Sequence, residues 1–324
     1  MGPFYFKKVV ILTSEKRDME NQKKSLLIIL AFFAIYVIWG STYLWVKIAV
    51  AELSPLFLAA FRFLCAGALI FVIAKVMGIS LKISAGQLKN TFFAGLCFLV
   101  IGNGLMVWAL KYIDSGFAAL QISAQPLVVL LMMRLLQGKK IKAMSMIGVV
   151  LGMIGIFLLV SQKQIVTKDG SLTGILMILI CMLSWSYGSL FVSKVDLPKN
   201  FFVSTGYQML SAGVMLLLVS FLLGEQWSIP TQWMGKTQVS MALLIALGSI
   251  VAFTSFNYLL KVVSPEKVAT STYVNPIVAF ILGWYFLDEQ ISGQSILAAI
   301  ILLTGVFFIN TKKSVVIFTR FRGK

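Results

Sequence analysis

Residues 115–137 read SGFAALQISAQPLVVLLMMRLLQ, and residues 271–290 read STYVNPIVAFILGWYFLDEQ. The first stretch is apolar over enough residues to cross a bilayer as a helix, which takes about 20. Each stretch carries a proline directly after a polar amide, as Gln125–Pro126 and Asn275–Pro276, so the two prolines lie 150 residues apart. An apolar segment that returns at a fixed offset predicts a helical membrane protein made of two similar halves.

The composition supports the same fold class. Hydrophobic residues make up 59% of the 324 residues and charged residues 12%, against roughly 45–50% and about 25% in ordinary soluble domains. A water-soluble fold has no means of burying that much apolar surface. The net charge of +17 would suit nucleic acid, but the basic residues form short clusters between long apolar runs. That placement is typical of cytoplasmic loops of membrane proteins, and we expect no nucleic-acid partner.

Ten apolar runs have roughly the length of a membrane span. They lie at 26–46, 55–76, 90–110, 115–137, 143–161, 172–193, 201–223, 238–260, 265–287 and 293–310. We therefore predict an all-α integral membrane protein of about ten transmembrane helices. The predicted parts are a cytoplasmic tail at 1–25, a five-helix repeat at 26–161, an extracytoplasmic loop at 162–171, a second five-helix repeat at 172–310, and a cytoplasmic tail at 311–324.

Lysine and arginine fall mostly on one side of these runs. If the loops alternate between the two sides, 22 of the 28 basic residues lie on the side of both tails, five lie on the other side, and Arg62 lies within a run. The positive-inside rule then predicts that both termini are cytoplasmic. Either Met1 or Met19 is the first residue of the protein.

The two halves match at further positions. Lys111, Ser145 and Gly155 fall on Lys261, Ser295 and Gly305 at an offset of 150, and Trp39 falls on Trp185 at an offset of 146. Five is an odd number, so the second five-helix unit enters the membrane from the opposite side. This predicts inverted repeats, a construction known from secondary transporters, whose substrates bind where equivalent segments meet.

Several short motifs carry a family resemblance. The first run holds Trp39-Gly40-Ser41-Thr42-Tyr43, the second holds Pro55 and Phe61-Arg62-Phe63, the fourth and ninth hold Pro126 and Pro276, and Asp288-Glu289 follows the ninth. Together with two five-helix halves, these motifs resemble the EamA-like exporters of the drug/metabolite transporter superfamily over nearly the whole chain after residue 25. Two positions depart from the family's pattern. Lys139 occupies the first-half position that is equivalent to Glu289, and the sixth run reads Trp185-Ser186-Tyr187 instead of Trp-Gly.

The resemblance implies an exporter of amino acids or similar metabolites in the bacterial cytoplasmic (inner) membrane, with a central cavity lined by both halves. From the residues themselves, we expect the solute to contact polar and aromatic side chains at mid-span depth, because unpaired polar groups are costly in lipid. The candidates are Trp39, Ser41, Thr42, Tyr43, Arg62, Asn103, Trp108, Gln121, Gln125, Trp185, Tyr187, Asn257, Tyr258, Tyr273 and Asn275.

Each kind of candidate has a structural alternative. The aromatic residues would also suit an interfacial belt, and the hydroxyl groups would also suit bonds to their own helix. The amides before Pro126 and Pro276 would also serve to repair the helix kinks that we expect at these prolines. Arg62 either reaches an interface or pairs with a substrate carboxylate or an acidic residue. We interpret Asp114, Glu266 and Asp288-Glu289 as solvated charges at span ends.

The sequence lacks residues that catalysis, cofactor binding and ATP-driven transport commonly require. The chain has no histidine, and Cys65, Cys97 and Cys181 stand alone in apolar runs, so we expect neither an enzyme nor a cofactor. No Walker A motif and no carboxylate at the centre of a run are present, which favours facilitated diffusion, exchange, or a proton site at a helix end. The alternative is a channel or a helical scaffold without carrier activity. We expect the bilayer and a neutral or zwitterionic solute as partners; a monomer suffices, and a homodimer is compatible.

Overall fold

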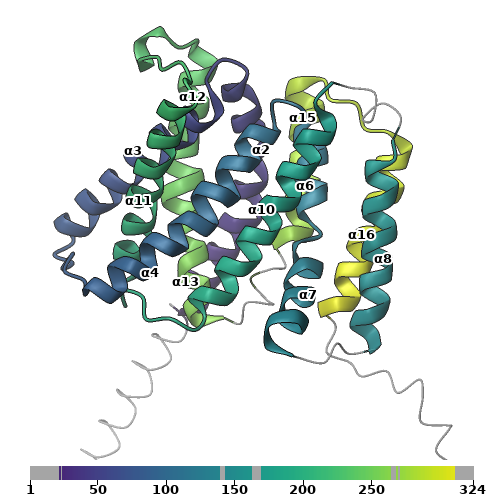
Figure 1. Ribbon diagram of the computed structural model, residues 1–324, viewed down its shortest axis with the longest axis horizontal. Coiled ribbons are helices and arrows are strands. Elements are labelled where there is room, and N and C mark those ends of the chain that lie inside the picture. The colour runs from purple at the N-terminus through teal and green to yellow at the C-terminus, as the bar shows by residue number, and fades with distance from the viewer. Residues whose placement is uncertain are drawn as a thin grey trace, which may run out of the picture.

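The computed structural model describes residue 22 and residues 24–138, 143–162, 169–263, 268 and 271–310, without the side chains of Ala143, Tyr273, Val306, Ile309 and Asn310. Within these residues every regular element is helical (Figure 1). The elements are η1 (Ala34–Ile38), α2 (Trp39–Val50), α3 (Pro55–Val76), α4 (Ala85–Gly95), η2 (Leu96–Gly104), α5 (Leu105–Ala109), α6 (Ser115–Ile122), α7 (Gln125–Gln137), α8 (Ala143–Val160), α10 (Ser171–Val192), α11 (Phe201–Leu222), η3 (Pro230–Gln232), α12 (Gly235–Leu243), η4 (Leu244–Phe253), α13 (Thr254–Val262), α15 (Ser271–Leu287) and α16 (Gly293–Asn310).

Among the described residues, seven helical segments are long and apolar enough to cross a membrane, and three more are apolar but shorter. The seven are Lys24–Val50, Pro55–Val76, Ala85–Ala109, Ser115–Gln137, Ser171–Val192, Phe201–Leu222 and Gly235–Val262; the shorter three are Met144–Val160, Val274–Leu287 and Gly293–Gly305. Each helix falls on one of the apolar runs predicted from the sequence. The chain is therefore a helical membrane protein.

The predicted start of the third run, at residue 90, is five residues late. The helix already begins at Ala85, because Ser84 and Gln87 form a capping box in which each side chain bonds the other residue's backbone N–H. Such a box starts a helix in a polar stretch that a hydropathy pattern does not register.

The helices α3 and α11 lie against each other along their length, at the left of Figure 1. A Cβ atom at Gly67 would lie 2.8 Å from Leu210 Cγ, and a Cβ atom at Gly213 would lie 2.7 Å from Leu64 Cγ. The contact is reciprocal, because positions 64 and 67 correspond to 210 and 213 at one offset of 146 residues. Small residues of this kind let two helix backbones approach closely in lipid.

A second pair, α8 and α16, lies at the right of Figure 1 and repeats this arrangement. A Cβ atom at Gly155 would lie 2.7 Å from Leu302 Cβ, and a Cβ atom at Gly305 would lie 2.8 Å from the Gly152 backbone nitrogen. Positions 152 and 155 correspond to 302 and 305 at an offset of 150 residues. Both helix pairs therefore join a segment of the first half to the matching segment of the second.

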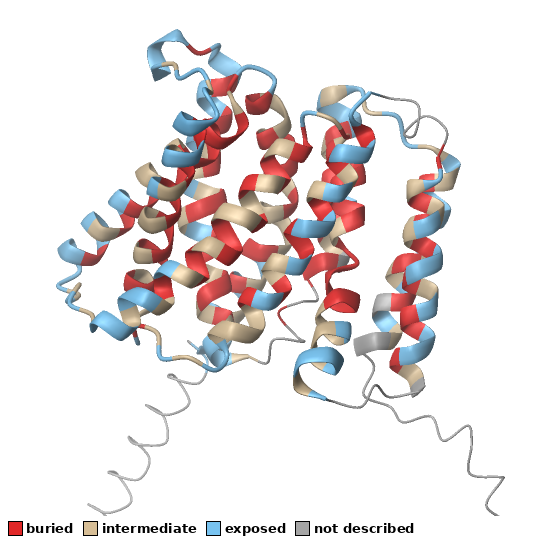
Figure 2. Ribbon diagram, in the orientation of Figure 1, coloured by how far each residue is buried: buried red, intermediate tan, exposed pale blue. Residues whose placement is uncertain are grey.

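Burial divides the helix surfaces into two kinds. Figure 2 shows buried residues on the faces that helices turn toward each other and exposed residues on outward faces and in the loops. The outward faces carry large apolar side chains, such as Phe221 and Phe307, which are 68% and 62% exposed. Apolar side chains on the outside of a bundle are expected where the surrounding solvent is lipid.

Three spans contain π-helical segments near their middle. These are η1 in the first span, η2 in the third and η4 in the eighth. A π-helical turn releases backbone carbonyls from the regular α-helical pattern, and it is frequently found at functional sites. Several of these carbonyls accept bonds from neighbouring helices, as described below.

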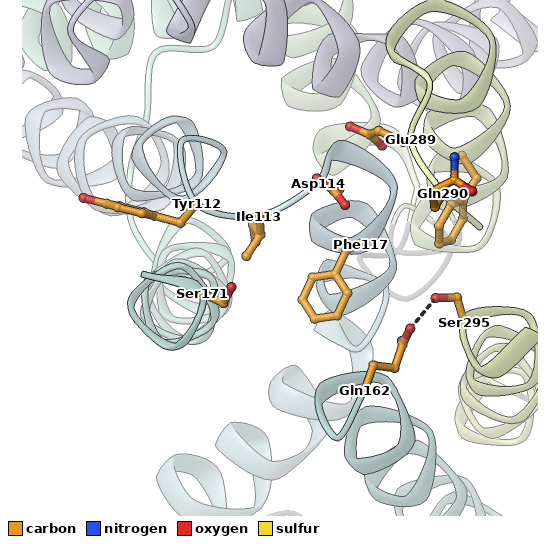
Figure 3. Close-up of a pocket in the computed structure, with 10 residues that line it drawn as sticks. Tyr112, Ile113, Asp114, Phe117, Gln162, Ser171, Glu289, Gln290 and Ser295 are labelled. Carbon is orange, nitrogen blue, oxygen red and sulfur yellow. Dashed lines mark hydrogen bonds between the residues drawn. The ribbon is translucent and has the colours of Figure 1, made fainter. Parts of the chain in front are cut away.

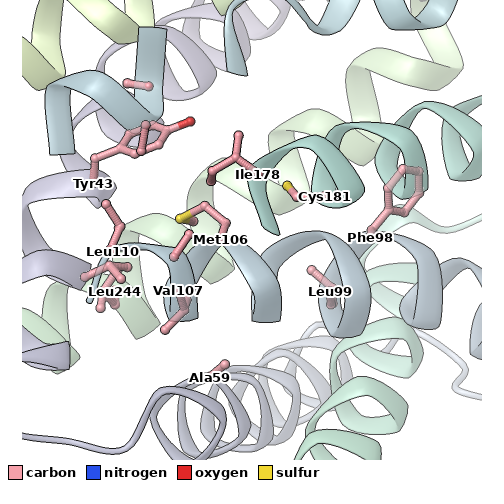
Figure 4. Close-up of a cluster of buried hydrophobic side chains, with 14 of the residues drawn as sticks. Tyr43, Ala59, Phe98, Leu99, Met106, Val107, Leu110, Ile178, Cys181 and Leu244 are labelled. Carbon is pink, nitrogen blue, oxygen red and sulfur yellow. The ribbon is translucent and has the colours of Figure 1, made fainter. Parts of the chain in front are cut away.

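A packed apolar cluster fills the interior of the described bundle, from Ile70 and Phe98 to Leu110 near the end at which α3 and α6 begin. Figure 4 shows part of it, with Tyr43, Met106, Leu110, Ile178 and Leu244 directed toward one another. All five side chains are at most 6% exposed. The part of the interior around these side chains is therefore closed.

Candidate functional site

Five aromatic side chains meet at the middle of the bundle, and we call them the central aromatic cluster. They are Trp39, Phe98, Trp185, Phe253 and Phe256. The Trp39 and Trp185 rings lie edge to face with their centroids 5.8 Å apart. Phe256 is 5.1 Å from Trp39 and 5.6 Å from Trp185. Four separate stretches of chain thus contribute to one aromatic surface, and Trp39 and Trp185 occupy matching positions of the two halves.

Backbone carbonyls of two π-helical segments accept hydrogen bonds that fix the position of the cluster. Trp39 Nε1 donates to the Gly248 carbonyl in η4 at 3.2 Å. Ser184 Oγ, next to Trp185, donates to the Cys97 carbonyl in η2 at 2.8 Å. A Cβ atom at Gly102 would lie 3.0 Å from the Trp185 ring, so a glycine at this position lets the indole approach η2 closely.

Buried polar atoms surround the aromatic surface, and several have no partner among the described residues. Arg62 Nε donates to Ser249 Oγ at 2.7 Å, and Asn257 Nδ2 donates to Thr205 Oγ1 at 3.0 Å. Arg62 Nη1, Asn103 Oδ1 and Thr254 Oγ1 are buried without a hydrogen bond. Buried polar groups are nearly always paired, so unpaired ones at mid-span indicate positions that water or a solute would satisfy.

The amides before the two prolines bind neighbouring helices at matching positions. Gln125 Nε2 donates to the Met182 carbonyl of α10 at 2.9 Å. In the orientation that satisfies both amide atoms, Asn275 Nδ2 donates to the Tyr36 carbonyl at 2.8 Å. Gln125 and Asn275 differ by 150 residues and Tyr36 and Met182 by 146, so the two bonds are equivalent. Both amides therefore tie spans together, and neither is a free lining group.

The two prolines act differently. The helix breaks at Pro126, since α6 ends at Ile122 and α7 begins at Gln125, whereas α15 runs on through Pro276. The predicted kink thus takes the form of a helix break in the first half. Gln121, one turn earlier, donates to the Ile175 carbonyl at 2.9 Å, while its Oε1 has no partner among the described residues.

The interpretation of Glu289 as a solvated loop charge is wrong. Its Oε1 accepts from the Ser115 N–H at 2.8 Å, and its Oε2 accepts from the Ser115 hydroxyl at 2.8 Å and the Gly116 N–H at 3.1 Å. The carboxylate thus caps the first turn of α6, where free N–H groups and the helix dipole favour an anion. Asp288, at a φ of 52°, makes the turn that directs Glu289 there.

Glu225 caps α3 in the same manner. Its two oxygens accept from the Leu56 and Phe57 N–H groups at 3.1 and 2.8 Å. The Ser220 hydroxyl also donates to Glu225 Oε2, at 2.7 Å. At the upper end of the bundle, two carboxylates of the second half therefore hold two helix starts of the first half.

A pocket opens at this upper end, beside α6 and α15. Figure 3 shows Asp114, Phe117, Gln162, Ser171 and Glu289 around it. Gln162 Oε1 accepts from Ser295 Oγ at 3.1 Å, and Ser171 Oγ is buried without a described partner. Residues of both halves line the pocket, and none of the lining residues belongs to the central aromatic cluster.

The other predicted residues have varied surroundings. Ser41 and Thr42 donate to carbonyls of their own helix, those of Val37 and Trp39, at 2.9 and 2.6 Å, which agrees with the structural alternative. Tyr43 belongs to the packed cluster of Figure 4, and Trp108 packs against the core. The Tyr273 side chain, together with Thr270 and Glu266, lies outside the described residues.

Two predicted tyrosines lie away from the centre. Tyr187 is 42% exposed and contacts Phe93 on the outer surface. Tyr258 stacks edge to face on Phe201 near the lower end of α13. Neither contacts the central aromatic cluster. Conversely, the sequence reasoning missed Phe98, Phe253 and Phe256, because among 25 phenylalanines none stands out without knowledge of the helix faces.

Comparison with known proteins identifies the family. The model of the EamA-like transporter family matches twice, at residues 26–161 and 172–311. This chain belongs to the EamA-like transporter family. It is 34% identical to the uncharacterized inner membrane transporter YedA of Escherichia coli (strain K12), over 87% of this chain and 90% of YedA. It is 26% identical to protein PecM of Dickeya dadantii (strain 3937), over 86% of this chain and 91% of PecM.

The EamA-like fold also has a solved counterpart. One crystal structure superposes with a TM-score of 0.64 at 20% identity, covering 88% of this chain and 96% of the other. The likeness shows a shared fold and nothing about the solute. Among the described residues, no group of three or more acidic, cysteine or histidine side chains is arranged to hold a metal ion. The central aromatic cluster joins matching residues of both halves and has unpaired buried polar atoms beside it, so it is the candidate site in this EamA-like protein.

Proposed function

We propose that this protein is a secondary transporter that exports small amphipathic metabolites, such as amino acids, across the bacterial inner membrane by alternating access. The observation that carries the proposal is the edge-to-face contact of Trp39 with Trp185. These residues occupy matching places of the two halves, and matching segments of an inverted-repeat transporter meet at its substrate site. The aromatic rings supply contact for an apolar body, and the surrounding polar atoms supply hydrogen bonds.

The proposed architecture is ten transmembrane helices in two inverted five-helix repeats, with both termini cytoplasmic. The reciprocal glycine contacts of α3 with α11 and of α8 with α16 support it. Two segments related by a two-fold axis contact each other in this way, residue i touching j and the equivalent of j touching the equivalent of i. Under the positive-inside rule, the upper end of Figure 1 faces outward.

The structure supports a state of the transport cycle in which the path from the aromatic surface to the outside of the cell is closed. The packed cluster around Tyr43 and Leu110 fills the space between the aromatic surface and the outer end. Glu225 and Glu289 hold the two halves together above it. To release a solute outward, the halves have to separate at these carboxylates, which gives each contact a place in the cycle.

A channel or a helical scaffold is the second candidate. Side chains pack across the middle of the described bundle, and Phe98 is fully buried there. A channel needs a continuous lined path, so this packing favours a carrier. One chain supplies both halves of the cluster, and we propose that the monomer is sufficient. No carboxylate of the described residues lies in the middle of a span, which favours exchange, facilitated diffusion, or a proton site at a helix end such as Glu289.

A substrate-panel assay tests the proposed function. Cells that overexpress the protein are loaded with a panel of neutral and zwitterionic metabolites, and efflux is measured against cells carrying an empty vector. A solute with increased efflux is then measured in proteoliposomes. We expect flux that saturates with concentration and is accelerated by the same solute on the opposite side. Flux that rises linearly without saturation would identify a channel, and no flux for any solute would favour the scaffold.

A further inference from the structure

Arg62 is a buried cation inside the span formed by α3. Its side chain is 3% exposed, and it is the one charged residue among the buried side chains of the described chain. Nε donates to the neutral Ser249 hydroxyl at 2.7 Å, and the guanidinium carbon lies 5.1 Å from the centre of the Phe63 ring. Nη1 is buried without a partner.

No carboxylate balances this charge among the described residues. Glu225 and Glu289 at the outer end are held by the first turns of α3 and α6. Glu52 accepts from the Met234 N–H at 3.0 Å. A charge that is removed from water without a counter-ion is costly, and the cost falls when an anion binds it. Among the described residues Arg62 therefore has no acidic partner, and its burial leaves it no contact with an interface.

The guanidinium lies beside the aromatic surface. A Cβ atom at Gly248 would lie 3.1 Å from Arg62 Nη2, and the carbonyl of the same glycine accepts the Trp39 indole N–H at 3.2 Å. Gly248 therefore separates the cation from the central aromatic cluster by one residue. The guanidinium and the Trp39 indole therefore lie against the same residue of η4.

We propose that Arg62 binds the carboxylate of the transported solute, and that the solute is a monocarboxylate with an apolar or aromatic body. This inference rests on the proposed transport function and names its substrate class. The planar guanidinium matches a carboxylate in geometry, because its N–H groups can donate to both carboxylate oxygens. The class includes zwitterions, whose carboxylate binds in the same manner.

The second half of the protein indicates that the solute carries one anionic group and not two. At the offset of 146 that relates α3 to α11, position 62 corresponds to Gln208, a neutral amide. Its Nε2 donates to the Ser204 hydroxyl of its own helix at 3.1 Å. The equivalent place in the second half thus carries no cation, and a dicarboxylate would leave one charge uncompensated.

A matched pair of probes tests the proposal. The purified protein is reconstituted in liposomes, and binding of 3-phenylpropanoate is compared with binding of 3-phenylpropanamide, which has the same body without the charge. We expect the acid to bind at least about tenfold more tightly. Arg62→Gln introduces the side chain found at position 208. This variant should weaken binding of 3-phenylpropanoate at least about tenfold and change binding of 3-phenylpropanamide less than about twofold. Lys75→Gln, at the exposed end of the same helix, serves as the control and should keep the acid preference.

Three results would overturn the proposal. Equal binding of acid and amide by the unaltered protein would do so without any variant, so the test stands even where Arg62→Gln does not fold. If Arg62→Gln weakens binding of both probes equally, Arg62 has a structural role through Ser249. Saturable transport of neutral solutes that does not depend on Arg62 would refute this inference and leave the proposed transport function intact. A preference for the acid with no saturable flux would refute transport and leave the anion site intact.

Discussion

Glu289 holds the first turn of α6 through Ser115, whose backbone N–H and hydroxyl both donate to its carboxylate at 2.8 Å. The two residues belong to different halves of the chain. A Cβ atom at Gly283 would collide with the Glu289 carboxylate, so the end of α15 is shaped to let this side chain reach across. The contact joins the two halves at the end of the bundle at which α6 begins, the upper end in Figure 1.

Removing this contact should favour the outward-open state. Glu289→Ala deletes hydrogen bonds to a charged acceptor, and we expect a loss of about 2 kcal/mol from the closed state, or roughly a 30-fold shift. Cys181, which is 5% exposed within the packed apolar cluster, reports the opening. In a Cys65→Ser, Cys97→Ser background, labelling by a membrane-impermeant maleimide added outside the cell should become faster.

The neighbouring Gln290, which is exposed, provides the control for this variant. Gln290→Ala should leave the labelling rate of Cys181 unchanged. If Glu289→Ala also leaves the rate unchanged, the carboxylate is a helix cap and does not hold the closed state.

The reciprocal glycines predict a symmetric effect on stability. Gly67→Val and Gly213→Val each place a branched side chain against a leucine and a backbone nitrogen of the partner helix. Overpacking of this kind costs about 1–3 kcal/mol, and the two variants should lower the melting temperature in detergent by similar amounts. Gly86→Ala, whose new Cβ would meet only Ser84 Oγ at 3.8 Å, is the control. A large effect in one variant with none in the other would contradict the proposed two-fold relation.

The proposed orientation has its own test. Asp169 and Lys194 are exposed residues at the two ends of α10. In a background without native cysteines, Asp169→Cys should react with an impermeant maleimide in intact spheroplasts, because the loop before α10 faces outward. Lys194→Cys should react only after permeabilisation. The reverse pattern would invert the topology and place both termini outside.

The sequence predicts the spans well because hydropathy is a property of each segment alone. It also predicts that Trp39 and Trp185 are equivalent, since the repeat is visible in the residues. The face of each helix is harder to predict. Successive residues turn by about 100° around a helix, so Tyr187, two places after Trp185, points to the outer surface. Whether a candidate lies inside the bundle depends on packing partners that are distant in sequence.

The bonds of the candidate polar residues were not predictable for the same reason. Gln125 and Asn275 stand out before their prolines, but the carbonyls that they bind belong to other spans, at Met182 and Tyr36. Glu289 looks like a loop charge in sequence, because nothing local shows that the start of α6 lies beside it. The π-helical segments also have no sequence pattern of their own, and they set the positions of Phe98 and Phe253.

The central claim is that the solute binds at the aromatic surface shared by the two halves. Solute flux into proteoliposomes, compared for the unaltered protein, Trp39→Ala, Trp185→Ala and Tyr187→Ala, tests it most directly. Tyr187 is an aromatic residue of the same helix as Trp185 and faces outward, so its variant controls for the loss of an aromatic ring. We predict that both tryptophan variants lower kcat/KM at least about tenfold, equivalent to about 1.4 kcal/mol, while Tyr187→Ala retains most of the flux. Unchanged flux in both tryptophan variants would contradict the claim.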